Sequence, residues 1–354
     1  VCNGVSGYSS FMKELQKLSR GDKVAILSPS FAAPGCWPHV HELGLQRLRE
    51  IFGLQPVEYP STRDLQASVE QKAADLETAF ADPEIKAVIA TIGGDIQVTY
   101  VANLKRGVFV DNPKPFFGYS DNSHMANFLF LLGIPSFYGA SVLTQFAMQG
   151  NMDAFTVDYT KHALFDKGEF QLLSAPTYND IGLHWDDPAL LQSTRAHEPN
   201  DGWYWDGDVS TTGLLWGGCV ESVDEMMRHA AAIPSLEQFE DVVLMLETSE
   251  EIPPASYVLR VIRALGERGI LARVRGVLMG RAKAWEFDKP QATAKKAAYR
   301  AAQREVVVAT VRRYNGQIPI VQNLDFGHTD PQIPMPYGGR ARIDAHKREI
   351  WASF

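Results

Sequence analysis

Cysteine is scarce in this sequence, and the few that occur do not form a motif. Cys2, Cys36 and Cys219 are far apart and odd in number, so they predict neither a disulfide framework nor a metal site built from clustered cysteines. A chain with so little cysteine is typical of the reducing cytosol. We therefore expect a cytoplasmic protein.

Long apolar runs and an excess of basic residues are also missing. No segment approaches the ~18 consecutive apolar residues of a membrane-spanning helix, and residues 1–7 lack the basic and apolar regions of an export signal. The 34 Lys and Arg residues are outnumbered by 42 Asp and Glu residues, which gives a net charge of -8. Because the basic residues are scattered, they do not form the patch that nucleic-acid phosphates require. Neither a membrane nor a nucleic acid is an expected partner.

What remains is the composition of an ordinary globular protein with room for two domains. Hydrophobic residues make up 45% and charged residues 21% of the 354 residues. In the first half, short apolar runs bounded by turn residues alternate with amphipathic segments. Strands are predicted at 23–27, 57–59, 87–92, 115–119 and 134–139, and helices at 41–51, 68–80 and 122–132. This alternation predicts an open, doubly wound α/β domain with a parallel sheet.

The pattern weakens between residues 170 and 208, where Pro, Asp, Asn and Trp accumulate. We interpret this stretch as a linker that carries a long functional loop. Beyond it we predict a turn at 216–219, helices at 222–232, 256–268 and 292–313, and strands at 242–246, 274–280, 318–321 and 341–345. The predicted units are therefore 1–168, a linker at 169–211, and a second α/β domain at 212–354.

Ser120 lies at the junction between a predicted buried strand and a helix. Such a turn exposes the serine oxygen at the carboxyl edge of the sheet and directs helix N–H groups to the same point, where they can stabilise an oxyanion. The alternative is that Ser120, Asp121 or Ser123 only caps the helix. Gly93 and Gly94 end the preceding strand, so their backbone should lie beside Ser120, although paired glycines are more often simple turns.

Two further residues can work with a serine nucleophile. Glu247 directly follows an apolar strand, where a carboxylate can orient an imidazole, although it can equally be a capping acid. His328 lies in a turn-rich loop, and loops on rigid scaffolds often carry catalytic groups. With Asp325 or Asp330 it could bind a metal, but no motif with ligand spacing supports this. No metal and no cofactor are therefore predicted.

The combination of these motifs is more specific than any one of them. In order and separation they resemble the LD-carboxypeptidase family of serine peptidases, through Gly118-Tyr119-Ser120-Asp121, Leu246-Glu247 and Gly327-His328, with Gly93-Gly94 and Trp216-Gly217-Gly218 fitting the same pattern. The resemblance extends from about Lys23 to the C-terminus. Within the family the chain is most similar to the microcin C immunity proteins, because of its long Trp-bearing segment and its Gly-Tyr-Ser-Asp turn.

The resemblance implies a flavodoxin-like N-terminal domain, a smaller α/β C-terminal domain and a homodimer. It implies a triad in which Ser120 is the nucleophile, His328 the general base and acid, and Glu247 the orienting carboxylate. The backbone N–H groups of Gly94 and Asp121 would form the oxyanion hole. A histidine base of ordinary pKa would make activity rise with pH between about 6 and 7.

The resemblance leaves two reactions open. One is cleavage of the amide between an acidic residue and a modified adenylate, and the other is release of D-alanine from a murein tetrapeptide. We favour the first, with Trp185 stacking on the base and with Gly93, Gly217 and Gly218 as further substrate contacts. Cys219 stands where the family pattern has Asn, so one contact differs. A third possibility is a non-catalytic two-domain binding protein, since fold alone does not fix function.

Overall fold

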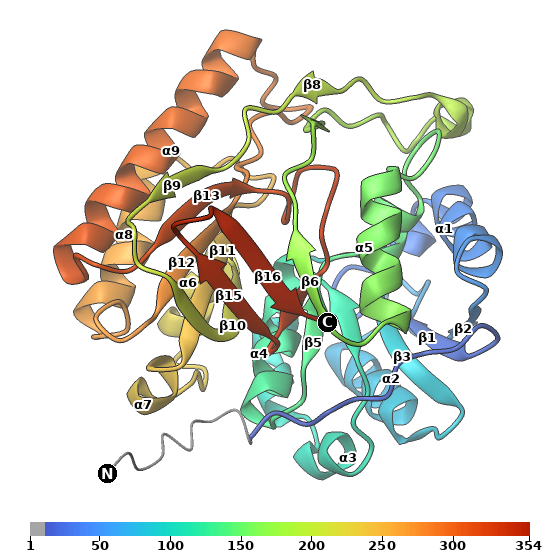
Figure 1. The fold of residues 1–354 in the computed structure, drawn as a ribbon. Helices are drawn as coiled ribbons and strands as arrows, with labels where there is room; N and C mark the ends of the chain where they lie inside the picture. The colour runs from blue at the N-terminus through green and yellow to red at the C-terminus, as the bar shows by residue number, and fades with distance from the viewer. Residues whose placement is uncertain (1–10) are drawn as a thin grey trace.

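The computed structural model describes residues 11–354 (Figure 1). Cys2 and the N-terminal stretch considered above for an export signal lie outside these residues. The described chain is a mixed α/β structure with a six-stranded sheet, an eight-stranded sheet and a small two-stranded sheet. None of the helices within residues 11–354 combines the length and the apolar character that a bilayer crossing requires.

The first sheet has the strand order of a flavodoxin-like fold. Its order is β2-β1-β3-β4-β5-β14, and the first five strands are parallel, as in the doubly wound order 2-1-3-4-5. The strands are β1 (Lys23–Leu27), β2 (Gln55–Glu58), β3 (Ile85–Ala90), β4 (Phe116–Gly118), β5 (Ser136–Tyr138) and β14 (Met335–Tyr337). The fold class predicted from the sequence is confirmed.

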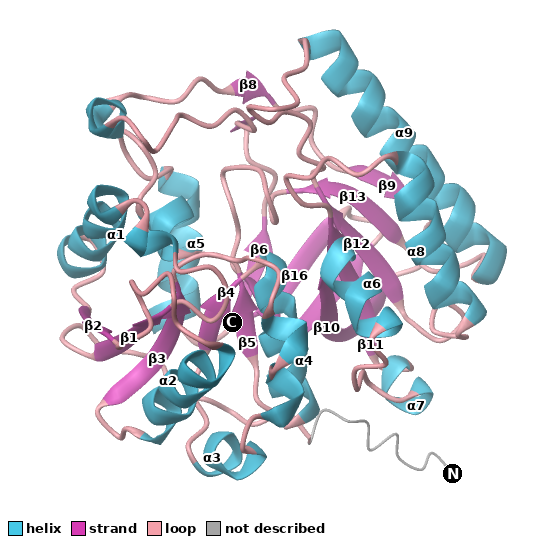
Figure 2. Cartoon of the chain, turned by 180° about the vertical axis from the view of Figure 1, so that it is seen from behind, coloured by secondary structure: helices cyan, strands magenta, loops and turns pink. Residues whose placement is uncertain are grey.

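Helices cover both faces of this sheet (Figure 2). Successive residues of a strand point to opposite faces: Val24 of β1 packs in a cluster with α1 and α5, and Ala25 in a cluster with α2, α3 and α4. These helices are α1 (Pro38–Glu50), α2 (Val69–Ala81), α3 (Arg106–Asp111), α4 (Ser123–Leu131) and α5 (Ala154–Phe165). Helix α5 was not predicted from the sequence. Its buried positions include polar side chains such as Thr156 and Thr160, which interrupt the apolar stripe of an amphipathic helix.

The second sheet is parallel at its centre and antiparallel at its edges. Its order is β6-β16-β15-β10-β11-β12-β13-β9. The strands are β6 (Glu169–Leu172), β9 (Tyr204–Asp206), β10 (Thr211–Cys219), β11 (Val242–Glu247), β12 (Gly276–Gly280), β13 (Ile320–Leu324), β15 (Arg340–Asp344) and β16 (Glu349–Ser353). The helices are α6 (Val220–Arg228), α7 (Leu236–Phe239), α8 (Ala255–Glu267) and α9 (Thr293–Tyr314).

The two sheets exchange segments that are distant in sequence. Strands β6 and β9, from the stretch at 169–211, are the edges of the second sheet, and β14 returns from the C-terminal part to pair with β5. Between β6 and β9 the chain forms β7 (Thr177–Tyr178) and β8 (Glu198–Pro199) and extends across to α1 (Figure 1). The turn predicted at 216–219 is wrong: these residues end β10, where Gly217 and Gly218 pair with Met245 and Leu246.

Candidate active site

Ser120 lies on a strained turn at the carboxyl end of β4. It begins a short 3-10 helix, Ser120–Asn122, that leads into α4, and its φ is 63°. A positive φ is costly for a residue with a side chain and is found most often at functional sites. Neither the 3-10 helix nor α4 has a side-chain cap, so the capping alternative for Ser120 is not what the structure shows.

The glycine pair after β3 lies directly against this turn. A Cβ on Gly93 would lie 2.8 Å from the Cβ and 3.0 Å from the Oγ of Ser120, and a Cβ on Gly94 would lie 2.1 Å from the Oγ of Ser30. Gly94 has a φ of 150°, a conformation that favours glycine. The pair is therefore required to bring this backbone close to Ser120.

Glu247 and His328 are joined by a short hydrogen bond. Glu247 ends β11 and is fully buried, and its Oε2 lies 2.7 Å from Nδ1 of His328. A Cβ on Gly327 would lie 2.4 Å from the same carboxylate oxygen, so glycine is needed before the histidine. Glu247 and His328 are 81 positions apart in the sequence, and the fold brings them into contact.

Tyr138, which was not among the predicted site residues, connects Glu247 to the serine turn. Its hydroxyl donates to Oε1 of Glu247 at 2.6 Å and accepts from the backbone N–H of Ser120 at 3.1 Å. The N–H of Ser120 is thus already occupied by this hydrogen bond. A tyrosine inside an apolar strand gave no signal, because tyrosine is common in strands for packing alone.

Glu250 was also missed, and it contacts the other nitrogen of the histidine. Its Oε2 lies 3.0 Å from Nε2 of His328, so the imidazole is held between two carboxylates. Burial by itself lowers the pKa of His328, but the charges and hydrogen bonds of Glu247 and Glu250 more than offset it and raise this pKa to about 10. The ordinary histidine pKa that we expected from the sequence is therefore too low, because the sequence does not show that Glu250, from the loop after β11, contacts His328.

A cavity of about 430 Å³ opens in front of these groups. Of the predicted site residues, Ser120, Gly93, Gly94, Trp185 and His328 line it, together with Glu250. Its volume is in the range of small-molecule sites. The cationic side chains on its wall already have partners: Arg195 is paired with Asp330, and Lys283 lies 2.7 Å from Glu286.

The loop at 169–211 brings Trp185 to the cavity wall. Trp185 packs edge-on against Trp37 of the N-terminal domain, with ring centroids 5.1 Å apart, and its carbonyl contacts Nε2 of His39 at 2.6 Å. The other tryptophans of the loop lie elsewhere: Trp203 donates to Asp325 and packs with Trp205 against the core of the second sheet. Trp185 is therefore the tryptophan of this loop that faces the cavity.

Gly218 lies against the serine turn, Gly217 packs against β11, and neither residue is part of the cavity wall. A Cβ on Gly218 would lie 2.4 Å from the Oγ of Ser123, a hydroxyl that donates to the carbonyl of Ser120. Cys219 is buried, its thiol contacts Glu221, and burial raises its pKa well above the usual range. Gly218 and Cys219 contact Ser123 behind the turn, and neither they nor Gly217 line the cavity.

Comparison with known proteins identifies the family of this chain. Residues 24–139 match the LD-carboxypeptidase N-terminal domain and residues 212–343 match the LD-carboxypeptidase C-terminal domain. The chain belongs to the LD-carboxypeptidase family. It is thus a hydrolase of a serine peptidase family, as the motifs predicted.

The relatives span nearly the whole chain. A putative carboxypeptidase of Treponema pallidum is 27% identical over 344 residues, which are 96% of this chain and 94% of the relative. The crystal structure of an MccF-like protein from Streptococcus pneumoniae in complex with AMP has a TM-score of 0.82 and 26% identity, covering 94% of this chain and 98% of that one. The microcin C7 self-immunity protein MccF in complex with aspartyl sulfamoyl adenosine has a TM-score of 0.82 and 20% identity, covering 96% of this chain and 98% of that one.

Proposed function

We propose that this LD-carboxypeptidase family member hydrolyses an amide through a triad of Ser120, His328 and Glu247. The observation that carries the proposal is the short contact between His328 and Glu247 beside a cavity that also exposes Ser120 on its strained turn. In the proposed reaction His328 accepts the proton of Ser120 as the serine oxygen attacks the carbonyl, and returns it to the leaving nitrogen. Glu247 fixes Nδ1 as the protonated nitrogen and stabilises the imidazolium.

The developing oxyanion would be bound by the backbone N–H groups of Gly94 and Asp121. Two features support this assignment: the glycine pair packs against Ser120, and the N–H of Ser120 itself already donates to Tyr138. Backbone donors held by a rigid turn need no reorganisation when charge develops.

Before His328 can act as a base, its Nε2 must be released from Glu250. The Glu250 side chain is about half exposed and lies on the cavity wall, so a bound substrate can displace it. The contact with Glu250 therefore describes a resting state in which the histidine carries a proton.

This resting state predicts an unusual pH dependence. Since the pKa of His328 is raised to about 10, kcat/KM should keep rising with pH well above neutrality, because only the neutral imidazole accepts a proton. Glu250→Gln removes one of the two negative charges, so it should lower that pKa and move the rise to lower pH, as a pH–rate profile of both proteins would show.

Glu286→Gln is the matched control, because Glu286 lines the same cavity but pairs with Lys283. It should leave the pH profile in place. A rise centred between about pH 6 and 7 in all three proteins, the range of an unperturbed histidine, would show that Glu250 does not influence the base.

For the substrate we propose an aminoacyl adenylate in which an amide joins an acidic residue to a modified adenylate. The support is the presence of Trp37 and Trp185 at the cavity wall, packed edge to face, because a tryptophan ring is a side chain on which a nucleobase can stack, together with the AMP complex of the Streptococcus pneumoniae relative. MccF itself has been solved with aspartyl sulfamoyl adenosine. With such a substrate, the proposed role of the enzyme is detoxification or self-immunity of the microcin C type.

If Trp185 stacks on the base, Trp185→Ala should weaken kcat/KM on an aspartyl or glutamyl sulfamoyl adenylate by about 1–3 kcal/mol, the usual contribution of one stacked base. Trp185→Phe keeps an aromatic face and should lose much less. A murein tetrapeptide has no base, so any cleavage of it should be the same in all three proteins.

Mass spectrometry of the products from both substrates distinguishes the two reactions. Release of D-alanine from the tetrapeptide, with the adenylate left intact, would replace the adenylate proposal by a murein carboxypeptidase. Tight binding of the adenylate with no cleavage of either substrate would favour the non-catalytic binding protein.

A further inference from the structure

We propose that Asp121, His124 and Glu225 form a binding site for one divalent metal ion of the Zn²⁺ type. The three side chains lie behind the serine turn rather than in the cavity, and no step of the hydrolysis uses them. Each offers one donor atom, and the three donors lie within 4.8 Å of one another. The site would join the residue after the nucleophile to a helix of the second domain.

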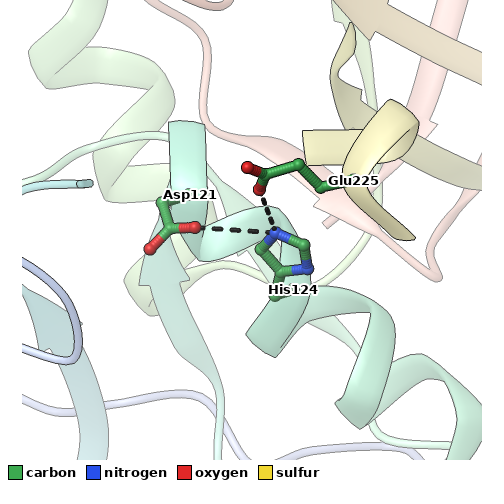
Figure 3. Close-up of side chains that lie close together, drawn as sticks. All are labelled: Asp121, His124 and Glu225. Atoms are coloured by element: carbon green, nitrogen blue, oxygen red, sulfur yellow. Dashed lines mark hydrogen bonds and ion pairs between the residues drawn. The ribbon is translucent and has the colours of Figure 1, made fainter. Parts of the chain in front are cut away.

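The geometry is that of a partial coordination shell. Nε2 of His124 lies 3.1 Å from Oε2 of Glu225 and 3.6 Å from Oδ1 of Asp121, and Figure 3 shows the two carboxylates converging on this one nitrogen. In a tetrahedral site with bonds of 2.0–2.1 Å, neighbouring ligand atoms are about 3.3 Å apart. Both separations from the imidazole nitrogen are close to that value, and the oxygens of Asp121 and Glu225 lie within 4.8 Å of each other, so an ion requires these two carboxylates to move closer together by at most about 1.5 Å.

The second observation is an unsatisfied oxygen. Asp121 is 2% exposed, and its Oδ1 has no hydrogen-bond partner, while its Oδ2 accepts from the backbone of Gln97. Buried carboxylate oxygens are normally hydrogen-bonded, ion-paired or bound to a metal. Oδ1 faces Nε2 of His124 at 3.6 Å, which is an ion-pair distance but too long for a hydrogen bond (Figure 3), so an ion between the two atoms would give Oδ1 the close contact that it lacks.

The donor set and the access route agree with such an ion. One imidazole nitrogen and two carboxylate oxygens suit Zn²⁺ and similar first-row ions better than Ca²⁺ or Mg²⁺, which prefer oxygen alone. Two carboxylates also neutralise the charge of a divalent cation. Asp121 and His124 are buried, but Glu225 is 27% exposed at its side chain, so the ion can enter from its side.

The placement gives the ion a positioning role. Asp121 follows Ser120 in the 3-10 helix, His124 is in the first turn of α4, and Glu225 is on α6, directly after β10. An ion held by all three would fix the serine turn of the first sheet to a helix of the second. Sequence spacing did not reveal the site because His124 and Glu225 are 101 residues apart.

The test measures metal directly. The untagged protein is stripped with EDTA, dialysed against Zn²⁺, and analysed for bound metal by mass spectrometry and for thermal unfolding. We expect one ion per chain and a rise of a few degrees in Tm on adding Zn²⁺, because a ligand of the folded state alone stabilises it. His124→Ala and Glu225→Ala should each lose the bound ion and the Zn²⁺-dependent rise.

Asp224→Asn is the matched control, since Asp224 is a neighbouring carboxylate on α6 that contacts Tyr257 and Arg228 instead. It should bind Zn²⁺ as the unmodified protein does. Every variant keeps the exposed Cys36, so Zn²⁺ bound there contributes equally to all of them. Melting of the metal-free variants shows whether each is folded. If the unmodified protein binds no more Zn²⁺ than the two alanine variants, the three side chains are only a buried histidine between two carboxylates and the proposal fails.

Discussion

Replacement of Ser120 by alanine should abolish hydrolysis, with a loss of turnover on the order of 10⁴-fold or more, as removal of a triad nucleophile does. Folding should be little affected, because the Ser120 side chain caps neither helix and lies at the cavity wall. The measurement is product formation by mass spectrometry together with the thermal unfolding midpoint of the variant.

Ser120→Gly is a second variant that separates chemistry from structure. Ser120 has a φ of 63°, which is strained for serine and alanine and relaxed for glycine. The glycine variant should therefore be as inactive as the alanine variant and at least as stable as the unmodified protein. Near-normal turnover in either variant would exclude Ser120 as the nucleophile.

Glu247→Gln should reduce kcat on the order of 10³- to 10⁴-fold while the site keeps its shape. Glu247 accepts hydrogen bonds from both Tyr138 and His328, and an amide cannot replace both acceptors. If the amide oxygen faces Tyr138, the amide N–H₂ forces the proton of His328 onto Nε2, where it blocks the base. If the oxygen faces His328, the buried tyrosine hydroxyl loses its acceptor.

Glu251→Gln controls for the loss of one negative charge in the same loop, since Glu251 is exposed. It should retain normal turnover in the same assay. Equal turnover of Glu247→Gln and the unmodified protein would remove Glu247 from the triad, and the histidine would then need another orienting group.

The first sheet and the principal site residues were predictable because their signals are local. Strands buried on both faces appear as continuous apolar runs, and Ser68 with Gln71 forms a capping box at the start of α2. Ser120 and His328 follow strands of this kind, and Glu247 is the last residue of one, where the backbone must turn. The long strand β10 was read as a turn at its glycines, because local propensity cannot show that these glycines pair with a neighbouring strand.

The sequence by itself therefore determined the fold class, the family and the types of residue at the carboxyl edges of the strands. Only the tertiary structure decided their partners: Tyr138 between the serine turn and Glu247, Glu250 on the free nitrogen of His328, and Glu225 opposite Asp121 and His124. The physical reason is that a hydrogen bond or ion pair depends on separations of about 3 Å. Such separations between residues that are distant in sequence are set by packing, and they cannot be inferred from the spacing of the residues along the chain.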